Sequence, residues 1–180
     1  MPEIEIRPAI EADIPILTAM DHSYTTEYVW QMDVGRKAEG RLEIVFRQVR
    51  LPRSVRVEYP RRASALAENW AERDGLLVAV HAGQPVGYAS FRVDVAPLTT
   101  WVSDLVVSGS IRRKGIGASL LLAAEEWAEH HDCQRLILAV QPKNFPAIRL
   151  AQKIGFDFCG YNDRYYANED IGLFFGKYLW

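Results

Sequence analysis

Residues 108–121 read SGSIRRKGIGASLL and connect a strand-like run to an apolar, helix-forming run. Arg112, Arg113 and Lys114 come just before Gly115 and Gly117. The first amides of an α-helix have no partner within the helix and carry the positive end of its dipole, so they attract anions. Glycine has no Cβ and lets an anion reach the main chain. The stretch therefore predicts a pyrophosphate site, with a solvated basic turn as the alternative.

Adjacent basic residues at the start of a helix favour a bound ligand. Each one opposes the helix dipole and costs roughly 0.3 to 1 kcal/mol at an exposed site, which an anion offsets. Two common nucleotide loops do not fit this stretch. A P-loop places its lysine after the glycines, whereas Lys114 precedes them, and a dinucleotide fingerprint needs a third glycine that this sequence lacks.

The composition is that of one folded domain, which we expect to span residues 1–180. A net charge of -2 gives no general attraction to nucleic acid or to a membrane, so anion binding must be local. Cys133 and Cys159 have no metal-ligand spacing, which predicts free thiols and no metal site. The first residues, MPEIEIRPAI, contain no apolar leader, and no run approaches the roughly 18 apolar residues of a membrane span. We expect a cytoplasmic protein.

Apolar periodicity and turn residues predict alternating strands and helices. The first helix carries Ile14, Leu17, Met20 and Tyr24 at helical spacing. Asn144 is expected to cap a helix that Gly155 ends. The expected elements are a strand at 4–10, a helix from residue 11, a strand or hairpin arm at 41–51, a helix at 61–75 stopped by Gly75, a hairpin at 76–93, a strand at 99–107, a helix at 118–129, a strand at 135–140, a helix at 147–154 and a closing hairpin at 156–180.

Two segments resemble the GNAT superfamily of N-acetyltransferases. Arg112-x-x-Gly115-x-Gly117 is similar to its acyl-CoA signature, and NFPAIRLAQKIGF at 144–156 is similar to a second family motif. The resemblance implies an α/β (α+β) fold with a central mixed, mostly antiparallel, twisted sheet of six or seven strands flanked by helices on both faces. It also implies that acetyl-CoA is the cosubstrate. The implied cofactor-binding residues are Leu105, Val106 and Val107 for pantetheine, Arg113, Lys114, Gly115, Ile116, Gly117 and Ala118 for the pyrophosphate with Arg112 adding charge, and Asn144 further along.

Three positions depart from the family pattern. Ala151 stands where a tyrosine usually protonates the leaving thiolate, and Ser103 and Ala139 stand where glutamates often accept a proton. Asp104 is the candidate base, with a structural carboxylate paired to an arginine as the alternative. A missing acid or base slows such chemistry by about 10² to 10⁴ fold without removing orientation effects. The candidate replacement acids are Tyr161, Tyr165 and Tyr166 on the closing hairpin and Tyr24 and Tyr28 on the first helix.

The acceptor is expected to bind between the first helix, the segment 32–60 and the closing hairpin. Acidic residues there could attract a cationic amine, or could simply be solvated; they are Asp21, Glu27, Asp33, Glu58, Asp163, Glu169 and Asp170. The chain length and the stretches VRVEYP at 55–60 and IGLFFGKYL at 171–179 are similar to the streptothricin acetyltransferase branch.

This resemblance implies acetyl transfer to a primary amine of a small cationic molecule, such as an amino-bearing antibiotic or a polyamine. The alternatives are a noncatalytic acyl-CoA-binding or sensing domain, a protein N-terminal or lysine acetyltransferase, and a plain phosphate-binding module. We expect neither nucleic acid nor membrane as a partner. A homodimer is left open, because the apolar end LFFGKYLW at 173–180 could extend a sheet into a second copy.

Overall fold

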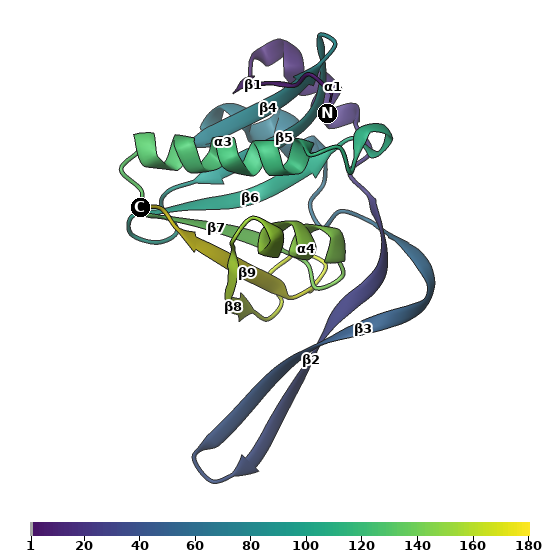
Figure 1. Cartoon of the computed structure of the whole chain (residues 1–180), viewed down its shortest axis with the longest axis vertical. Coiled ribbons are helices and arrows are strands. Elements are labelled where there is room, and N and C mark those ends of the chain that lie inside the picture. Colours follow the sequence, from purple (N-terminus) through teal and green to yellow (C-terminus); the bar gives the residue numbers. More distant parts are fainter. Residues whose placement is uncertain (1) are drawn as a thin grey trace.

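A seven-stranded sheet forms the centre of the protein (Figure 1). The computed structural model describes residues 2–180, apart from the side chain of Lys37. The sheet order is β1-β4-β5-β6-β7-β9-β8, and every neighbouring pair is antiparallel except β6 and β7. This confirms the expected mixed, mostly antiparallel sheet. The strands are β1 (Glu5–Pro8), β2 (Tyr24–Ala38), β3 (Arg41–Val57), β4 (Gly75–His81), β5 (Gln84–Arg92), β6 (Thr99–Val107), β7 (Arg135–Val140), β8 (Asp157–Asn162) and β9 (Gly172–Tyr178).

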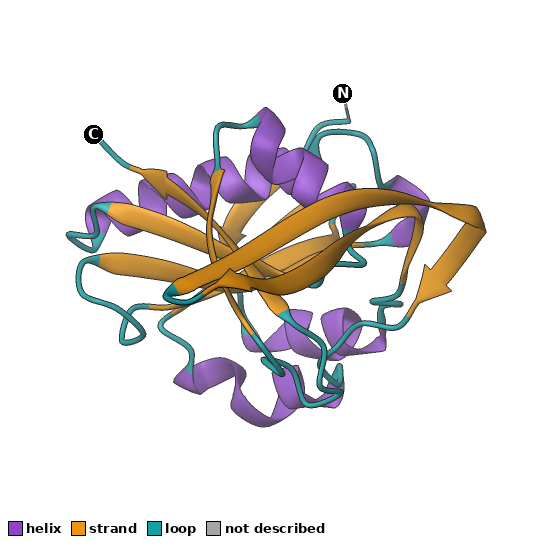
Figure 2. Cartoon of the chain, turned by 90° about the horizontal axis from the view of Figure 1, so that it is seen from below, coloured by secondary structure: helices purple, strands orange, loops and turns teal. Residues whose placement is uncertain are grey.

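Helices cover both faces of the sheet, as expected (Figure 2). The helices α3 (Ile116–His130) and α4 (Phe145–Lys153) pack on one face through residues such as Leu120 and Ile148, which are fully buried. The helices α1 (Ile14–Ala19) and α2 (Ser64–Asn69) pack on the other face through Leu17 and Leu66. Three short 3₁₀ helices lie at Glu11–Asp13, Trp70–Glu72 and Gly109–Ile111. In the described part of the chain, no helix is long and apolar enough to span a membrane.

Several local predictions are confirmed. The hairpin β4–β5 turns at Ala82 and Gly83, which both have positive φ. Asn144 caps α4, because its Oδ1 accepts a hydrogen bond from the Ala147 amide at 3.2 Å. The apolar run of β7 is buried as expected for a strand covered on both faces.

Two helix boundaries were wrong. The first helix ends at Ala19, and Met20 is already extended, so Tyr24 begins β2 rather than continuing the helix. Asp21 turns the chain by accepting a hydrogen bond from the Ser23 amide. The helix expected up to residue 75 is only α2 followed by a 3₁₀ turn.

Gly75 does not stop a helix but begins β4. A Cβ at this position would lie 2.7 Å from both the Phe91 and the Trp127 ring. Glycine is therefore needed there because two aromatic rings pack against the strand, and its place in the sequence resembles a helix stop by coincidence.

The segment expected to be mostly irregular is a long antiparallel ribbon that projects from the sheet (Figure 1). We call residues 24–57, which form β2, β3 and their turn, the arm. Gly40, with φ +73°, supplies the turn. At the other end of the chain, β9 lies between β7 and β8. The C-terminal run therefore has a partner strand on each side, and the expectation that it extends the sheet into a second copy was wrong.

The packing around Gly75 can be tested by stability. Gly75→Ala is expected to lower the free energy of unfolding by about 1 to 3 kcal/mol, because the added methyl group overpacks the two rings. Urea denaturation followed by circular dichroism measures this. Gly35→Ala is the matched control, since nothing lies within 4 Å of its Cβ position. Equal stabilities of the two variants would contradict the packing explanation.

Candidate cofactor and acceptor site

The parallel pair β6 and β7 is hydrogen-bonded over only part of its length. Thr99–Val102 pair with Arg135–Leu138, and the pairing ends there. On its other edge, β6 remains paired with β5 as far as Val107. From Ser103 onward, the edge of β6 that faces β7 is therefore open to an extended ligand. The residues expected to bind pantetheine, 105–107, lie on this open stretch.

The loop after β6 presents main-chain amides at the start of α3. Arg113 and Gly115 have φ of +62° and +85°, and Gly115 is the N-cap residue. Within residues 2–180, no hydrogen bond reaches the amides of residues 116–118, and no side chain caps the helix. The exposed Arg113, Lys114 and Gly115 line, together with Pro2, a pocket of about 580 Å³. This arrangement can hold a diphosphate, as the sequence predicts.

Two of the residues that were expected to bind the pyrophosphate do not offer it their side chains. Arg112 turns back to β6, where its Nε donates to the carbonyl oxygen of Val107 at 2.7 Å. It is half-buried, and burial lowers the pKa of its guanidinium, while Asp21 raises it. The Ile116 side chain is buried, so this residue offers a ligand only its amide. Arg112 therefore shapes the loop, and Arg113 and Lys114 supply the exposed charge.

Gly117 lies against α4 and β6. A Cβ there would lie 2.9 Å from Cδ2 of Leu150 and 4.0 Å from Cγ2 of Val107. The glycine thus lets the first turn of α3 approach α4 and β6, whereas the sequence interpretation assigned it to close approach of a phosphate. Gly115, with its left-handed φ, is the glycine that the loop conformation demands.

Asn144 lies at the start of α4, where β7 ends. Its Oδ1 is engaged as the helix cap, so a ligand could use only the side-chain amide nitrogen or the main chain. Its contact with a cofactor stays a prediction.

Asp104 is buried in a cluster of fixed hydrogen-bond donors. Oδ2 accepts from Nη1 of Arg73 and from Oγ of Ser90, each at 2.8 Å, and Oδ1 accepts from the Tyr59 hydroxyl at 2.7 Å. Nη1 of Arg61 lies 3.7 Å from Oδ1. Burial raises the pKa of Asp104, but the two arginines and the two hydroxyl groups outweigh it and hold the pKa below its usual range.

These contacts match the alternative that the sequence left open, a structural carboxylate paired with arginine. A carboxylate that is stabilised in its charged form and already accepts three hydrogen bonds is poorly suited to take a proton from an amine. No motif pointed to the donors Tyr59, Arg61 and Arg73, and the last two lie in the stretch that was expected to be one helix at 61–75. Arg61 also donates to the carbonyl oxygen of Ser103 at 3.1 Å, at the start of the open stretch of β6.

The five candidate tyrosines separate by what their hydroxyl groups do. Tyr24 donates to Oε1 of Gln141 at 2.7 Å, and the Tyr165 hydroxyl accepts from Nε1 of Trp101 at 3.2 Å. Tyr28 packs on Phe145, and Tyr161 packs on Phe46 of the arm. Tyr24 and Tyr28 belong to β2, so the expectation that they lie on the first helix was wrong.

Tyr166 differs from the others because it is 6% exposed and its hydroxyl has no hydrogen-bond partner in the described part of the chain. The guanidinium of Arg61 lies over its ring, with Cζ 5.1 Å from the centroid. Arg61 also contacts Ser103, so its guanidinium group connects the Tyr166 ring to the open edge of β6. Burial raises the pKa of Tyr166, and Arg61 opposes that shift.

The end of β7 is held by a second set of polar contacts. Gln141 is 2% exposed; its Oε1 accepts from Tyr24, and its Nε2 donates to Oδ2 of Asp170 at 2.7 Å. Lys143 donates to both oxygens of Asp170 at 3.1 Å. These contacts hold the end of β7 away from the unpaired stretch of β6; we call the gap between the two strands the opening.

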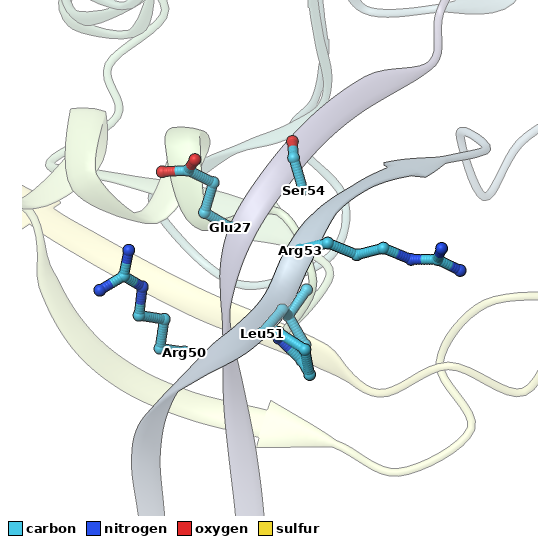
Figure 3. A pocket seen from close by; sticks show the side chains of 6 residues that line it. Glu27, Arg50, Leu51, Arg53 and Ser54 are labelled. Atoms are coloured by element: carbon cyan, nitrogen blue, oxygen red, sulfur yellow. The ribbon is translucent and has the colours of Figure 1, made fainter.

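Most of the acids expected to attract a cationic amine are paired with basic residues. The pairs are Asp21 and Glu58 with Arg56, Asp33 with Arg47, Glu169 with Arg164 and Asp170 with Lys143. Glu27 instead lines a pocket of about 380 Å³ at the base of the arm (Figure 3). The pairing of β2 and β3 skips there from Thr26–Val55 to Tyr28–Arg50. Within residues 2–180, no group of three or more His, Cys, Asp or Glu side chains could hold a metal ion.

The fold and the two motifs define an acyltransferase of the GNAT type. The model of the acetyltransferase (GNAT) family matches residues 44–156, which is more than half of the chain, and the protein belongs to this family. The streptothricin acetyltransferase of Streptomyces lavendulae is 29% identical over 167 residues, covering 90% of this chain and 86% of that protein. The spermine/spermidine N(1)-acetyltransferase of Bacillus subtilis (strain 168) is 34% identical over 61 residues, covering 33% of this chain and 40% of that protein.

Solved structures share the fold over nearly the whole chain. Nourseothricin acetyltransferase superposes with a TM-score of 0.81 at 22% identity, covering 98% of each chain. A protein named as a streptothricin acetyltransferase of Bacillus anthracis str. Ames, in complex with acetyl coenzyme A, gives a TM-score of 0.74 at 18% identity, covering 98% of this chain and 99% of that one.

The loop assignment predicts that Gly117→Glu weakens CoA binding by at least about 100-fold, because the side chain brings a negative charge to the proposed anion site. Isothermal titration with CoA measures this, and circular dichroism checks that the variant folds. Gly109→Ala is the control, since nothing lies within 4 Å of its Cβ position. If Gly117→Glu bound CoA as tightly as the parent, the cofactor site would have to be elsewhere.

The Asp104 cluster predicts a loss of stability that depends on pH. Asp104→Asn is expected to lower the free energy of unfolding by about 1 to 3 kcal/mol at pH 7, because it leaves two partly buried arginines without a counter-charge. The native pKa of Asp104 is lowered, so its contribution is complete above the unfolded pKa of about 3.9 and is lost as the pH falls through the native value.

Urea denaturation over a pH series tests this, with the exposed Asp94→Asn as control. A stable Asp104→Asn protein that has lost only turnover would instead favour Asp104 as the base.

Proposed function

We propose that the protein is an N-acetyltransferase that transfers the acetyl group of acetyl-CoA to a primary amine of a small cationic molecule. The observation that carries the proposal is the open edge of β6 from Ser103 onward, which leads directly to the unpartnered amides at the start of α3. A pantetheine arm is extended and hydrogen-bonds along a strand edge, and a diphosphate suits a helix N-terminus. The edge of β6 and the start of α3, which follow each other in the chain, thus offer hydrogen-bonding groups to the pantetheine arm and to the diphosphate of CoA.

The chain's own residues divide the work as follows. Main-chain groups of residues 105–107 bind and align the extended arm, and Arg113 and Lys114 neutralise the diphosphate. Bound acetyl-CoA supplies a thioester carbonyl that a neutral amine can attack. The amine nitrogen forms the amide bond, the carbon–sulfur bond breaks, and the sulfur leaves as a thiolate. Binding and alignment supply much of the rate in such a reaction.

Tyr166 is the residue that we assign to protonate the leaving thiolate, in place of the tyrosine that Ala151 replaces. Its ring is buried, and its hydroxyl makes no hydrogen bond in the described part of the chain and does not belong to the buried unsatisfied atoms, so it can reach the site and donate to the thiolate sulfur. The proton that the amine loses passes to solvent, and a proton from solvent restores the phenol. We assign Asp104 a positioning role, because it holds Arg61 against both Ser103 and the Tyr166 ring.

The choice of a small amine as acceptor is supported by the relatives. The Streptomyces lavendulae protein acetylates streptothricin by its name and aligns over 90% of this chain, and a further relative is named for spermine and spermidine. The pocket at the base of the arm does not support this choice, because Arg50 and Arg53 line it together with Glu27.

The proposal predicts release of the CoA thiol when acetyl-CoA is incubated with streptothricin or spermidine, and little release with a lysine-containing peptide. A thiol reagent follows the rate, and mass spectrometry identifies the acetylated amine. Tight CoA binding without thiol release for any amine would favour a binding or sensing domain. ADP binding as tight as CoA binding would favour a plain phosphate-binding module.

The acid assignment has its own test. Tyr166→Phe is expected to lower kcat by about 10² to 10⁴ fold, because it removes only the hydroxyl group. CoA affinity, measured by titration, should stay unchanged. Tyr161→Phe is the matched control, since that ring packs on Phe46 away from β6. Unchanged kcat in Tyr166→Phe would exclude this residue as the acid.

A further inference from the structure

The arm is an amphipathic ribbon. Cross-strand pairing places Met32 opposite Phe46 and Val34 opposite Ile44, and alternation along β3 adds Leu42 to the same face. The neighbouring pairs, Gln31–Arg47 and Asp33–Val45, point to the opposite face, where Arg47 and Asp33 form an ion pair at 2.8 Å. We call the first face the stripe; it is formed by Trp30, Met32, Val34, Leu42, Ile44 and Phe46, none of which is charged.

The body of the protein covers only the base of the stripe. The Trp30 ring lies 5.6 Å from that of Phe175, and the Phe46 ring lies 5.1 Å from that of Phe158. The Trp30 amide also donates to the carbonyl oxygen of Pro142 at 2.9 Å, which fixes the base of the arm to the end of β7.

Beyond this point the stripe continues without cover. Val34 is 56% exposed, Leu42 60% and Ile44 36%, although they lie in line with the packed residues. The arm projects past the sheet at this point (Figure 1). A two-stranded ribbon is at best marginally stable alone in water, and four strands with a shared apolar interior are far more favourable. The uncovered end of the stripe therefore needs a second apolar surface.

We propose that this surface is the stripe of a second copy of the chain, and that the two arms pack face to face and antiparallel across a two-fold axis. The stripe is uncharged, so two copies meet without burying unpaired charges. An antiparallel arrangement also places the tip of each arm beside the body of the other copy.

The charge distribution supports this arrangement. Residues 24–57 carry seven basic and four acidic side chains, which leaves fourteen basic and nineteen acidic side chains for the rest of the chain. The arm is therefore positive by three charges and the remainder negative by five. An arm lying against the body of a second copy meets opposite charge, which favours this partner over an unrelated apolar surface.

The test compares two neighbouring residues of similar exposure on opposite faces of the arm. Ile44 belongs to the stripe, whereas Val45, 41% exposed, does not. Sedimentation equilibrium of the parent protein is expected to show twice the monomer mass at micromolar concentration. Ile44→Glu is expected to raise the dimer dissociation constant at least about 100-fold, because each interface would bury carboxylates without partners. Val45→Glu should change it by less than about threefold, as expected for a solvated position.

Folding is controlled by thermal melting and by CoA titration, since the tip of the arm takes no part in the cofactor site. If Ile44→Glu failed to fold, Leu42→Ser would replace it with the same expected direction. A parent protein that stayed monomeric up to millimolar concentration would overturn the proposal, as would equal effects of Ile44→Glu and Val45→Glu. Cosedimentation of a monomeric parent with anionic vesicles would assign the stripe to a membrane surface instead.

Discussion

The separation of β6 from β7 beyond their four paired residues is the constraint on which the site depends. Two parallel strands would normally continue to pair, because unpaired main-chain groups are costly when buried. Here each strand is held on its own side by polar side chains. Arg61 and Arg73 fix Asp104 at the open stretch of β6, and Tyr24 with Asp170 fixes Gln141 just after β7. The opening is therefore built into the fold before any ligand arrives.

The two ends of the arm provide a large part of this support. Tyr24 is the first residue of β2, and Tyr59 follows the end of β3 by two positions. One hydroxyl contacts the segment after β7 and the other contacts β6, so the chain enters and leaves the arm at the two sides of the opening. Both ends of the arm therefore contact the residues that border the opening. This gives a physical reason why a fixed arm would help a transferase that relies on alignment of its substrates.

The sequence was sufficient to predict those parts of the fold that local patterns determine. Alternating or continuous apolar runs predicted β4 to β7, and the glycine pair after basic residues predicted the loop at the start of α3, where anion binding stays a prediction. The sequence did not show why particular residues, such as the glycines, are needed at their positions. Gly75 is required because the rings of Phe91 and Trp127, which are distant in sequence, pack against it, and Gly117 lies against the Leu150 side chain. The sequence indicated a strand or hairpin arm at 41–51 but neither β2 nor the full length of the arm, because β3 alternates weakly and contains Pro52, which lies in a stretch unpaired with β2.

The burial of Asp104 shows why a residue's place in a motif does not define its chemistry. Next to a thioester site, an aspartate with an ordinary environment would be a reasonable base, and the sequence contains nothing that contradicts this. The decisive facts are three-dimensional: two arginines from separate segments and the hydroxyl groups of Tyr59 and Ser90 stabilise its charged form. The same cluster holds Arg61 over the Tyr166 ring, so a carboxylate that is unsuited to proton transfer can still position the tyrosine that we propose as the acid.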